Sequence, residues 1–239
     1  MEAPARTCIV IPTYNEKENV EAVVLAVSAV DPAFQMLFVD DSSPDGTADE
    51  VRRMAASHAN VHLLVREGKM GIGSAHMDGF RHAMDELGAQ VLVEMDSDFQ
   101  HPPAKVPELV SALGRGYDVA VASRKVEGGG TTNWSLWRRA VSRGANLLAR
   151  GVLGLKVKDS TSGFRALSGG AAGALVEARL PTSSYSFQVA SLFYLQKRGM
   201  KMTEVPFVFE PRKAGRSKMG LGEMARFFGN ILKIRALGV

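Results

Sequence analysis

Apolar, strand-like runs that alternate with helical patterns constrain the fold of this chain more than any other feature. Five runs rich in β-branched residues are each followed by a polar turn: Thr7–Ile11, Met36–Val39, Val61–Val65, Val91–Met95 and Val119–Ala122. Helical patterns fill the intervals: Glu16–Val30, Thr47–His58, Gly73–Leu87 and Ala104–Gly114. This alternation indicates βαβ units, so the sequence predicts an α/β fold with a mostly parallel central sheet flanked by helices. Ligands of such sheets bind beyond the carboxyl ends of the strands, and the polar turns are where chemistry is expected.

The pattern changes after Arg124. Residues 126–132 are rich in glycine and predict a mobile loop. Two later stretches, Trp134–Leu153 and Met224–Leu237, have the apolar periodicity of amphipathic helices and also carry Arg or Lys. Such helices either lie at a membrane surface or pack on the sheet or on a second subunit.

Composition excludes several classes of protein. Of 239 residues, 46% are hydrophobic and 23% charged, which is typical of a globular chain. The one cysteine, Cys8, lies in an apolar run, so a disulfide framework is excluded and a reducing compartment is expected. We expect neither a signal peptide nor a membrane-spanning helix, because no apolar stretch approaches about 18–20 residues. Residues 197–239 hold ten Lys/Arg against three Asp/Glu, which favours a polyanionic partner or surface over a merely solvated basic face.

The fourth strand ends in the strongest chemical signal of the sequence. Asp96 and Asp98 stand two residues apart directly after the apolar run, and Gln100 follows them. Beyond the strand end the two carboxylates can converge on one cation. Hard oxygen ligands suit Mg²⁺ or Mn²⁺, with a pyrophosphate supplying further oxygens. His101 is expected only to line this site.

Two other strand ends carry residues suited to a nucleotide. Tyr14 follows the first strand and can stack on a base, while Glu16 and an aspartate of the Asp40–Asp41 pair can accept hydrogen bonds from base or ribose. The alternative for residues 44–46 is a plain turn with Asp45 as a helix cap. Residues 71–76 (GIGSAH) superficially match a dinucleotide fingerprint but follow the third strand and lack the last glycine, so we expect tight packing there.

Ordered motifs along almost the whole chain resemble those of family 2, GT-A-fold inverting glycosyltransferases, and specifically of dolichol- or polyprenol-phosphate mannose synthases. They are PTYNE (12–16), VDDSSPDGT (39–47), MDSDFQHPP (95–103), SR (123–124), SRGAN (142–146), DSTSGFR (159–165), FQV (187–189), EVP (204–206) and PRKAGRSKM (211–219). The resemblance implies one GT-A domain over residues 1–239, with a nucleotide-sugar half (1–124) and an acceptor- and membrane-facing half (125–239).

The resemblance also implies roles for individual residues. The nucleotide would be bound by Pro12, Tyr14, Glu16, Val39 and Asp41. The metal would be held by Asp96, Asp98 and Gln100, while Ser97 would contact the substrate. The phosphates would be bound by Arg124, Arg212 and Lys218. Asp98, Arg124, Arg212 and Lys218 would be the catalytic set. Arg and Lys are the residues that neutralise phosphate groups, but a lone arginine at a strand end, such as Arg124, can equally form an ion pair.

By the same resemblance, the donor would be GDP-mannose and the acceptor a polyprenyl (dolichyl-type) monophosphate, with no nucleic acid involved. The enzyme would work peripherally on the cytoplasmic face of a membrane, through its own surface or a membrane-protein partner. Alternatives are UDP-glucose or another donor, a nucleotidyltransferase, and a non-catalytic binding module. One departure is Ala190, where many relatives carry an acid; another is that the chain shows no appended membrane helices.

Overall fold

The computed structural model describes residues 6–178, 180, 184–210 and 221–237. Its strands are β1 (Thr7–Thr13), β2 (Gln35–Asp40), β3 (Val61–Val65), β4 (Val91–Glu94), β5 (Val119–Ser123), β6 (Gly130–Thr131), β7 (Arg165–Ser168), β8 (Met202–Pro206) and β9 (Val208–Phe209). Its α-helices are α1 (Lys17–Val30), α2 (Thr47–Ala55), α3 (Ile72–Asp85), α4 (Val106–Gly114), α5 (Leu136–Leu153), α6 (Gly169–Glu177), α7 (Ser184–Lys197) and α8 (Leu221–Leu237), with a 3₁₀ turn at Pro103–Lys105.

The described residues form a seven-stranded central sheet in the order β3-β2-β1-β4-β7-β5-β8. Neighbouring strands are parallel except at β7, which runs antiparallel to both β4 and β5. The predicted mostly parallel α/β sheet is therefore confirmed, and the five predicted strands occur within two residues of their expected bounds.

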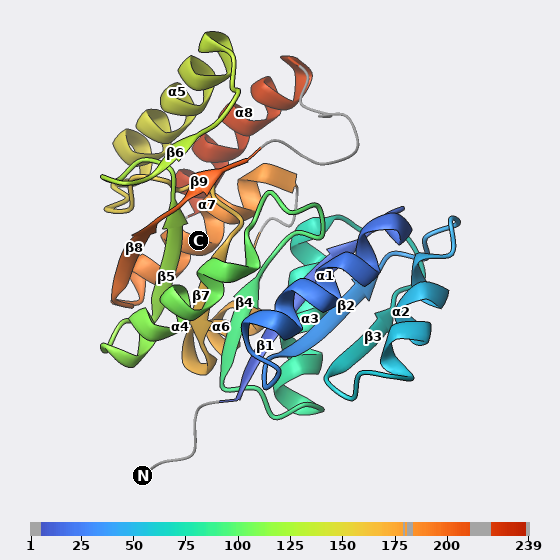
Figure 1. Cartoon of the computed structure of the whole chain (residues 1–239). Helices are drawn as coiled ribbons and strands as arrows, with labels where there is room; N and C mark the ends of the chain where they lie inside the picture. The colour runs from blue at the N-terminus through green and yellow to red at the C-terminus, as the bar shows by residue number, and fades with distance from the viewer. Residues whose placement is uncertain (1–5, 179, 181–183, 211–220, 238–239) are drawn as a thin grey trace.

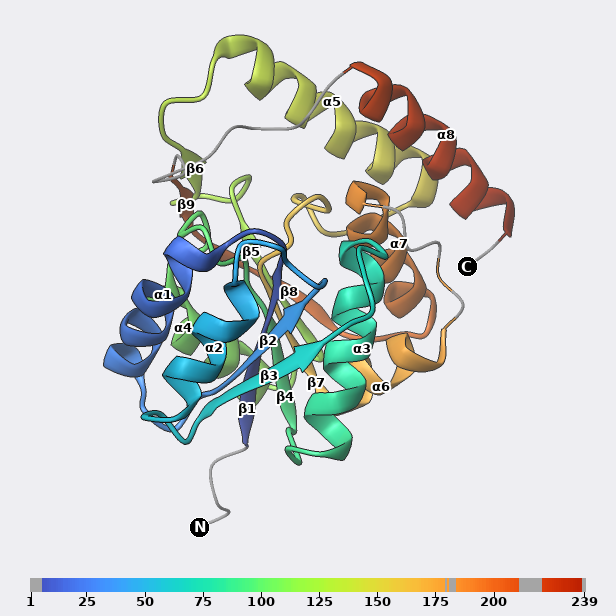
Figure 2. The same ribbon diagram turned by 90° about the vertical axis from the view of Figure 1, so that its right-hand side faces the viewer.

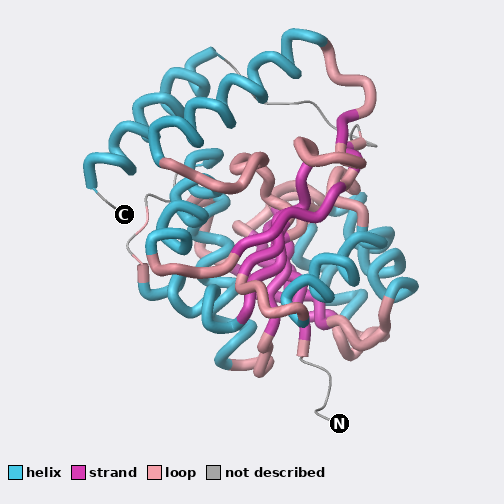
Figure 3. Tube along the Cα trace, turned by 90° about the vertical axis from the view of Figure 1, so that its left-hand side faces the viewer, coloured by secondary structure: helices cyan, strands magenta, loops and turns pink. Residues whose placement is uncertain are grey.

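Helices cover both faces of the sheet (Figures 1 and 3). Alternate residues of each strand point to opposite faces, and β1 shows this directly. Ile9 and Ile11 pack with α1, α2 and α4, whereas Cys8 and Val10 pack with α3, α6 and α7. Cys8 is fully buried, as predicted, and burial raises the pKa of its thiol to about 12.

One segment differs from the sequence-based expectation, and a second agrees with it. The glycine-rich stretch 126–132, predicted as a mobile loop, contains β6, which pairs with β9 in a small separate sheet. The Gly71–His76 segment does provide tight packing, as expected. A Cβ on Gly73 would lie 2.8 Å from the Phe187 ring, so α3 can approach α7 closely only with glycine there.

The helices α5 and α8 lie side by side at the end of the molecule toward which the parallel strands run (Figure 2). The predicted apolar side of α8 faces inward, because Ile231 and Ile234 are fully buried and Phe227 packs against the same core. Met224 and the side chain of Phe228 lie outside the described part. The alternative of packing on the protein is thus the correct one for this side of α8.

The helix α5 packs on the protein along one face, to which Leu148 and Val152 contribute partly buried side chains. Asn146, Ala149 and Leu153 face the protein, while Leu136 and Trp137 are 82% and 68% exposed. Trp134, just before α5, is partly buried and packs edge-on against Phe209. None of the described helices combines the length and apolarity needed to cross a bilayer.

Candidate active site

One edge of the sheet collects most of the residues singled out in the sequence. The carboxyl ends of β1, β2, β4 and β5 lie at this edge because these strands are parallel. The antiparallel β7 begins at the same edge, so the loop before it, residues 159–164, joins them. Three non-glycine residues have left-handed backbone angles directly beyond these strands: Asn15 (φ 59°), Ser42 (φ 52°) and Phe99 (φ 63°). Such conformations are uncommon and cluster at functional sites.

The turns after β1 and β2 are fastened to each other. Three consecutive backbone N–H groups after β1 donate to side chains of the β2 turn: Asn15 to Ser43 Oγ (3.0 Å), Glu16 to Thr47 Oγ1 (3.0 Å) and Lys17 to Asp45 Oδ2 (3.2 Å). Asp45 also accepts the backbone N–H of Thr47 at 3.0 Å. Asp45 thus binds the first N–H of α2 from within the turn, but the N-cap residue is Gly46, which has the left-handed angle of a turn glycine (φ 86°).

The two aspartates after β2 have different environments. Asp40 accepts hydrogen bonds from the Thr13 hydroxyl (3.0 Å) and the Ser43 N–H (2.9 Å), which fixes it in the turn. Asp41 lies 2.9 Å from the buried Arg66 guanidinium. Burial raises the pKa of Asp41, and the attraction of Arg66 opposes this rise. Arg66 was not predicted from the sequence.

The predicted base-stacking residue has a cation over its ring. Lys69 Nζ lies 4.2 Å from the centroid of Tyr14, which is partly buried. The Glu16 carboxylate accepts a hydrogen bond from Asn19 at 2.6 Å. Pro12 pairs with Val39 in the β1–β2 register, so both stand at the strand ends beside these turns.

The Asp96–Gln100 turn is held by its own backbone and by His101. The buried Asp98 carboxylate accepts the N–H of Gln100 at 3.0 Å. The Asp96 N–H donates to His101 Nδ1 at 3.0 Å, and the His101 ring stacks on Phe164 with 4.9 Å between centroids. Because Nδ1 accepts this bond, the neutral ring carries its proton on Nε2. His101 therefore holds the Asp96–Gln100 turn in place, which agrees with its expected role of lining the site.

The donor set of this turn fits a hard divalent cation. The Asp96 side chain is 37% exposed at the strand end, while Ser97, Asp98 and Gln100 are buried beneath it. Within the described residues no cluster of three or more His, Cys, Asp or Glu side chains could hold a metal alone. Two carboxylates and an amide oxygen leave positions for the oxygens of a bound pyrophosphate, as Mg²⁺ sites usually do.

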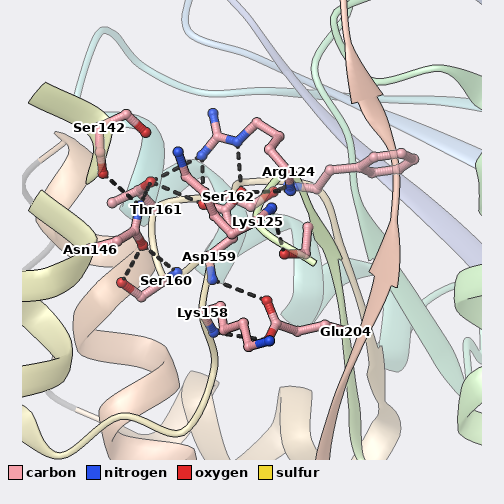
Figure 4. Close-up of polar contacts among 12 residues, drawn as sticks. Arg124, Lys125, Ser142, Asn146, Lys158, Asp159, Ser160, Thr161, Ser162 and Glu204 are labelled. Carbon is pink, nitrogen blue, oxygen red and sulfur yellow. Dashed lines mark hydrogen bonds and ion pairs between the residues drawn. The ribbon is translucent and has the colours of Figure 1, made fainter. Parts of the chain in front are cut away.

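Arg124 forms a two-pronged ion pair with Asp159 (Figure 4). Its Nε and Nη2 atoms each lie 2.7 Å from a carboxylate oxygen, and Nη2 also donates to Thr161 at 3.0 Å. Burial would raise the pKa of Asp159, but the hydrogen bonds and charge of Arg124 outweigh it and lower that pKa. The ion pair expected as the alternative for Arg124 is thus present, and only Nη1 makes no hydrogen bond within the described chain.

Hydrogen bonds extend this network to α5 and β8. Asn146 Oδ1 accepts from the Ser160 N–H at 2.7 Å, and the Glu204 carboxylate accepts from the N–H groups of Lys158 (2.8 Å) and Asp159 (3.0 Å) (Figure 4). The loop before β7 is therefore tied on both sides, which fixes Asp159 under Arg124. This loop was recognised in the sequence only as a motif, with no role for Asp159.

Behind the Asp96–Gln100 turn lie two buried groups that the sequence did not reveal. Glu94, the last residue of β4, pairs with Arg165 on β7 at 2.6 Å, and both are excluded from solvent. His76 is buried between Phe80 and Phe187, and burial lowers its pKa. Ala190, where an acid was noted in many relatives, is fully buried in the apolar core. Arg212 and Lys218 lie outside the described residues.

Comparisons with known proteins identify the family. The model of "Glycosyl transferase family 2" matches residues 8–173, more than half of the chain. The chain belongs to this family. A protein of Micrococcus luteus named undecaprenyl-phosphate mannosyltransferase is 37% identical over 95% of this chain and 93% of its own length. The polyprenol monophosphomannose synthase of Mycolicibacterium smegmatis is 38% identical over 90% of this chain and 81% of its own.

Solved structures agree on the fold of this family 2 chain. Glucosyl-3-phosphoglycerate synthase from Mycobacterium tuberculosis, crystallised with Mn²⁺ and UDP, matches with a TM-score of 0.68 and 23% identity. The match covers 98% of this chain and 81% of that one. The predicted GT-A-type architecture is therefore confirmed.

Proposed function

We propose that this family 2 glycosyltransferase transfers mannose from GDP-mannose to a polyprenyl monophosphate, forming a β-linked lipid-phosphate sugar. The observation that carries the proposal is the near full-length similarity to two proteins named for mannose transfer to polyprenyl phosphate, at 37% and 38% identity. The carboxyl end of the sheet supports the proposal in two ways. The Asp96–Gln100 turn there offers oxygen atoms suited to a divalent cation, and Arg124 is suited to bind a phosphate.

The nucleotide half, residues 1–124, is proposed to bind the donor. Tyr14 would stack on the base, Glu16 and Asp41 would accept hydrogen bonds from base or ribose, and Pro12 and Val39 would border them. Arg66, 2.9 Å from Asp41, would keep that carboxylate ionised and in place. In this proposal the donor displaces Lys69 from the Tyr14 ring.

Asp96 and Asp98, with Gln100, are proposed to hold Mg²⁺ or Mn²⁺, and Ser97 to contact the donor. The cation would neutralise charge on the departing nucleoside diphosphate. His101 would keep the Asp96 backbone aligned for this contact, since its Nδ1 accepts the Asp96 N–H.

The acceptor half, residues 125–239, is proposed to present the lipid phosphate. Glycosyl transfer passes through a transition state with oxocarbenium character, and an anionic phosphate can attack from the opposite face of the sugar. A phosphate monoester has a second pKa of about 6, so it needs positioning more than deprotonation. We therefore propose that no general base is indispensable, in keeping with the buried Ala190.

Arginine and lysine residues are proposed to clamp the phosphates. Arg124 retains one nitrogen, Nη1, for a phosphate oxygen while Asp159 holds the other two. Arg212 and Lys218 would complete the clamp. We expect Arg212→Ala and Lys218→Ala each to lower the rate about ten- to a hundred-fold, the effect of one charge-assisted hydrogen bond.

We further propose that the enzyme works peripherally on the cytoplasmic face of a membrane. The acceptor tail stays in the bilayer, because each exposed CH₂ costs about 0.8 kcal/mol. Leu136 and Trp137 on α5 are exposed and suited to contact with the bilayer or with a membrane-protein partner.

The decisive experiment offers the purified chain a panel of radiolabelled nucleotide sugars together with polyprenyl phosphates, followed by organic extraction. Label from GDP-mannose should enter the lipid fraction faster than label from UDP-glucose. Faster labelling from UDP-glucose would overturn the choice of donor. Binding without transfer or hydrolysis of any donor would identify a binding module instead.

A further inference from the structure

A cationic pocket lies beside the Arg124 network, outside the residues assigned to donor, metal and acceptor. It has a volume of about 330 Å³ and opens between α5 and the loops that follow β5 and precede β7. Its walls carry four cations together with Asn146 and Leu147; the cations are Lys125, Arg143, Arg150 and Lys158. Here these four cations are called the α5 pocket cations.

The nearest carboxylates do not neutralise this pocket. Asp159 is buried, and both of its carboxylate oxygens accept hydrogen bonds from Arg124. Glu204 accepts backbone N–H groups of the loop before β7. Throughout the described residues, no ion pair joins an acid to any α5 pocket cation. Four like charges around one small cavity therefore create a positive potential that favours an anion.

The environment of Lys125 also favours a bound anion. Burial lowers the pKa of this lysine; the attraction of Asp159 opposes the shift, and the charges of Arg124 and Arg143 add to it. A bound anion would relieve this repulsion. Arg124 does not line the pocket.

The outer rim of the pocket combines apolar and basic side chains. Arg143, Leu147 and Arg150 follow at spacings of four and three residues, so they share one stripe of α5. Leu147 is 72% exposed between the two arginines. The helix α5 lies at the periphery of the molecule (Figure 2). An exposed leucine flanked by arginines is the arrangement by which interfacial helices meet anionic bilayers.

We propose that the α5 pocket cations bind the phosphate of an anionic phospholipid headgroup while Leu147 inserts among the neighbouring acyl chains. A bilayer lipid, distinct from the polyprenyl acceptor, would thereby hold α5 on the membrane. The proposal rests on the proposed function, because a polyprenyl acceptor is what brings this chain to a bilayer.

Vesicle binding by the full chain tests the site. Phosphatidylcholine vesicles with and without phosphatidylglycerol are sedimented with wild type, with Arg143→Gln/Arg150→Gln, and with the control Arg81→Gln/Arg115→Gln. Both variants lose two exposed charges, but the control lies on α3 and at the end of α4. Each cation near an anionic surface contributes about fivefold in affinity, so the α5 variant should bind phosphatidylglycerol vesicles about 25-fold less tightly. Leu147→Gln should weaken binding as well.

Equal loss in the control would show general attraction of a basic protein and overturn the pocket. Wild-type binding by the α5 variant would overturn it too, as would full competition by dilute inorganic phosphate, which would indicate a site for a soluble anion. A separate assay of mannose transfer to a short, water-soluble polyprenyl phosphate distinguishes failure of the headgroup site from failure of the proposed function. Unchanged transfer with unchanged vesicle binding refutes only the headgroup site, whereas headgroup-dependent binding without any mannose transfer refutes only the proposed function.

Discussion

The Arg165 guanidinium and the Glu94 carboxylate meet in a two-pronged ion pair from which solvent is fully excluded, with Nη2 2.6 Å and Nε 3.0 Å from the carboxylate oxygens. Arg165 also donates to the Gln188 carbonyl and the Ser191 hydroxyl on α7. Glu94 stands two residues before Asp96, so this pair connects the Asp96–Gln100 turn to α7.

Removing one partner of this pair should destabilise the protein strongly. Arg165→Met leaves the Glu94 carboxylate buried without a counter-charge, which typically costs about 3–5 kcal/mol. We expect the urea midpoint to fall accordingly, and the double variant Glu94→Gln/Arg165→Met to recover part of the loss. A single variant within about 1 kcal/mol of wild type would show that the pair contributes little.

His76 should make stability depend on pH. Burial lowers its pKa in the folded protein, so the unfolded chain binds the extra proton as pH falls below about 6.5. Folding stability is then fully present above that pH and is lost as pH falls. Wild type should lose up to about 1.4 kcal/mol per pH unit more than His76→Gln between pH 6.5 and 5.5. Parallel curves of unfolding free energy against pH would contradict this.

Asp96→Asn and Asp98→Asn should each abolish transfer without unfolding the chain. A metal that stabilises the leaving group contributes several kcal/mol, so we expect rates at least about 1,000-fold lower with Mn²⁺ or Mg²⁺. Removing the metal with a chelator should have the same effect on wild type. Asp85→Asn, an exposed aspartate at the end of α3, is the matched control. Near-normal turnover by both site variants, with circular dichroism unchanged, would remove the metal site.

Arg124→Lys separates the structural role of this residue from its proposed catalytic role. Lysine keeps the charge but cannot form the fork with Asp159 while offering a third nitrogen to phosphate. We expect kcat/KM to fall about ten- to a hundred-fold. Asp159→Asn should lower stability at neutral pH. That difference should be complete above pH 3.8, shrink as the pH falls below this value, and disappear only below the lowered pKa of the folded protein. Unchanged kcat/KM in Arg124→Lys would leave Arg124 with a structural role alone.

Local pattern was sufficient to predict the fold of residues 1–124. Strands β1 to β5 are apolar runs bounded by turn residues, so their existence and order followed from the sequence. Two central-sheet strands were missed for the opposite reason. β7 has four residues and opens with the charged Arg165, and β8 contains Glu204 and Pro206. Both are strands because of their neighbours in the sheet, which local propensity does not reveal.

The sequence indicated the candidate site residues themselves but not the residues with which they form ion pairs. Asp96 and Asp98 stood out because they follow an apolar strand, and Arg124 was assigned through the family resemblance. Asp159 lies 35 residues from Arg124, and Arg165 lies 71 residues from Glu94. Such pairings depend on the sheet order, which places β7 between β4 and β5. Likewise, periodicity alone could not distinguish a helix that faces the bilayer from one whose Ile231 and Ile234 face the core.

The position of β7 sets an order on how the chain can assemble. β4 and β5 are consecutive strands in the sequence, yet they never touch in the sheet, and the strand that joins them begins only at residue 165. Before β7 pairs with β4, one edge of β4 has unpaired backbone groups. Glu94 on β4 then also lacks Arg165 as its counter-charge. Charged residues on an open edge discourage pairing with other chains. The Glu94 carboxylate, which Arg165 neutralises in the folded protein, would therefore disfavour pairing of the open β4 edge with another chain.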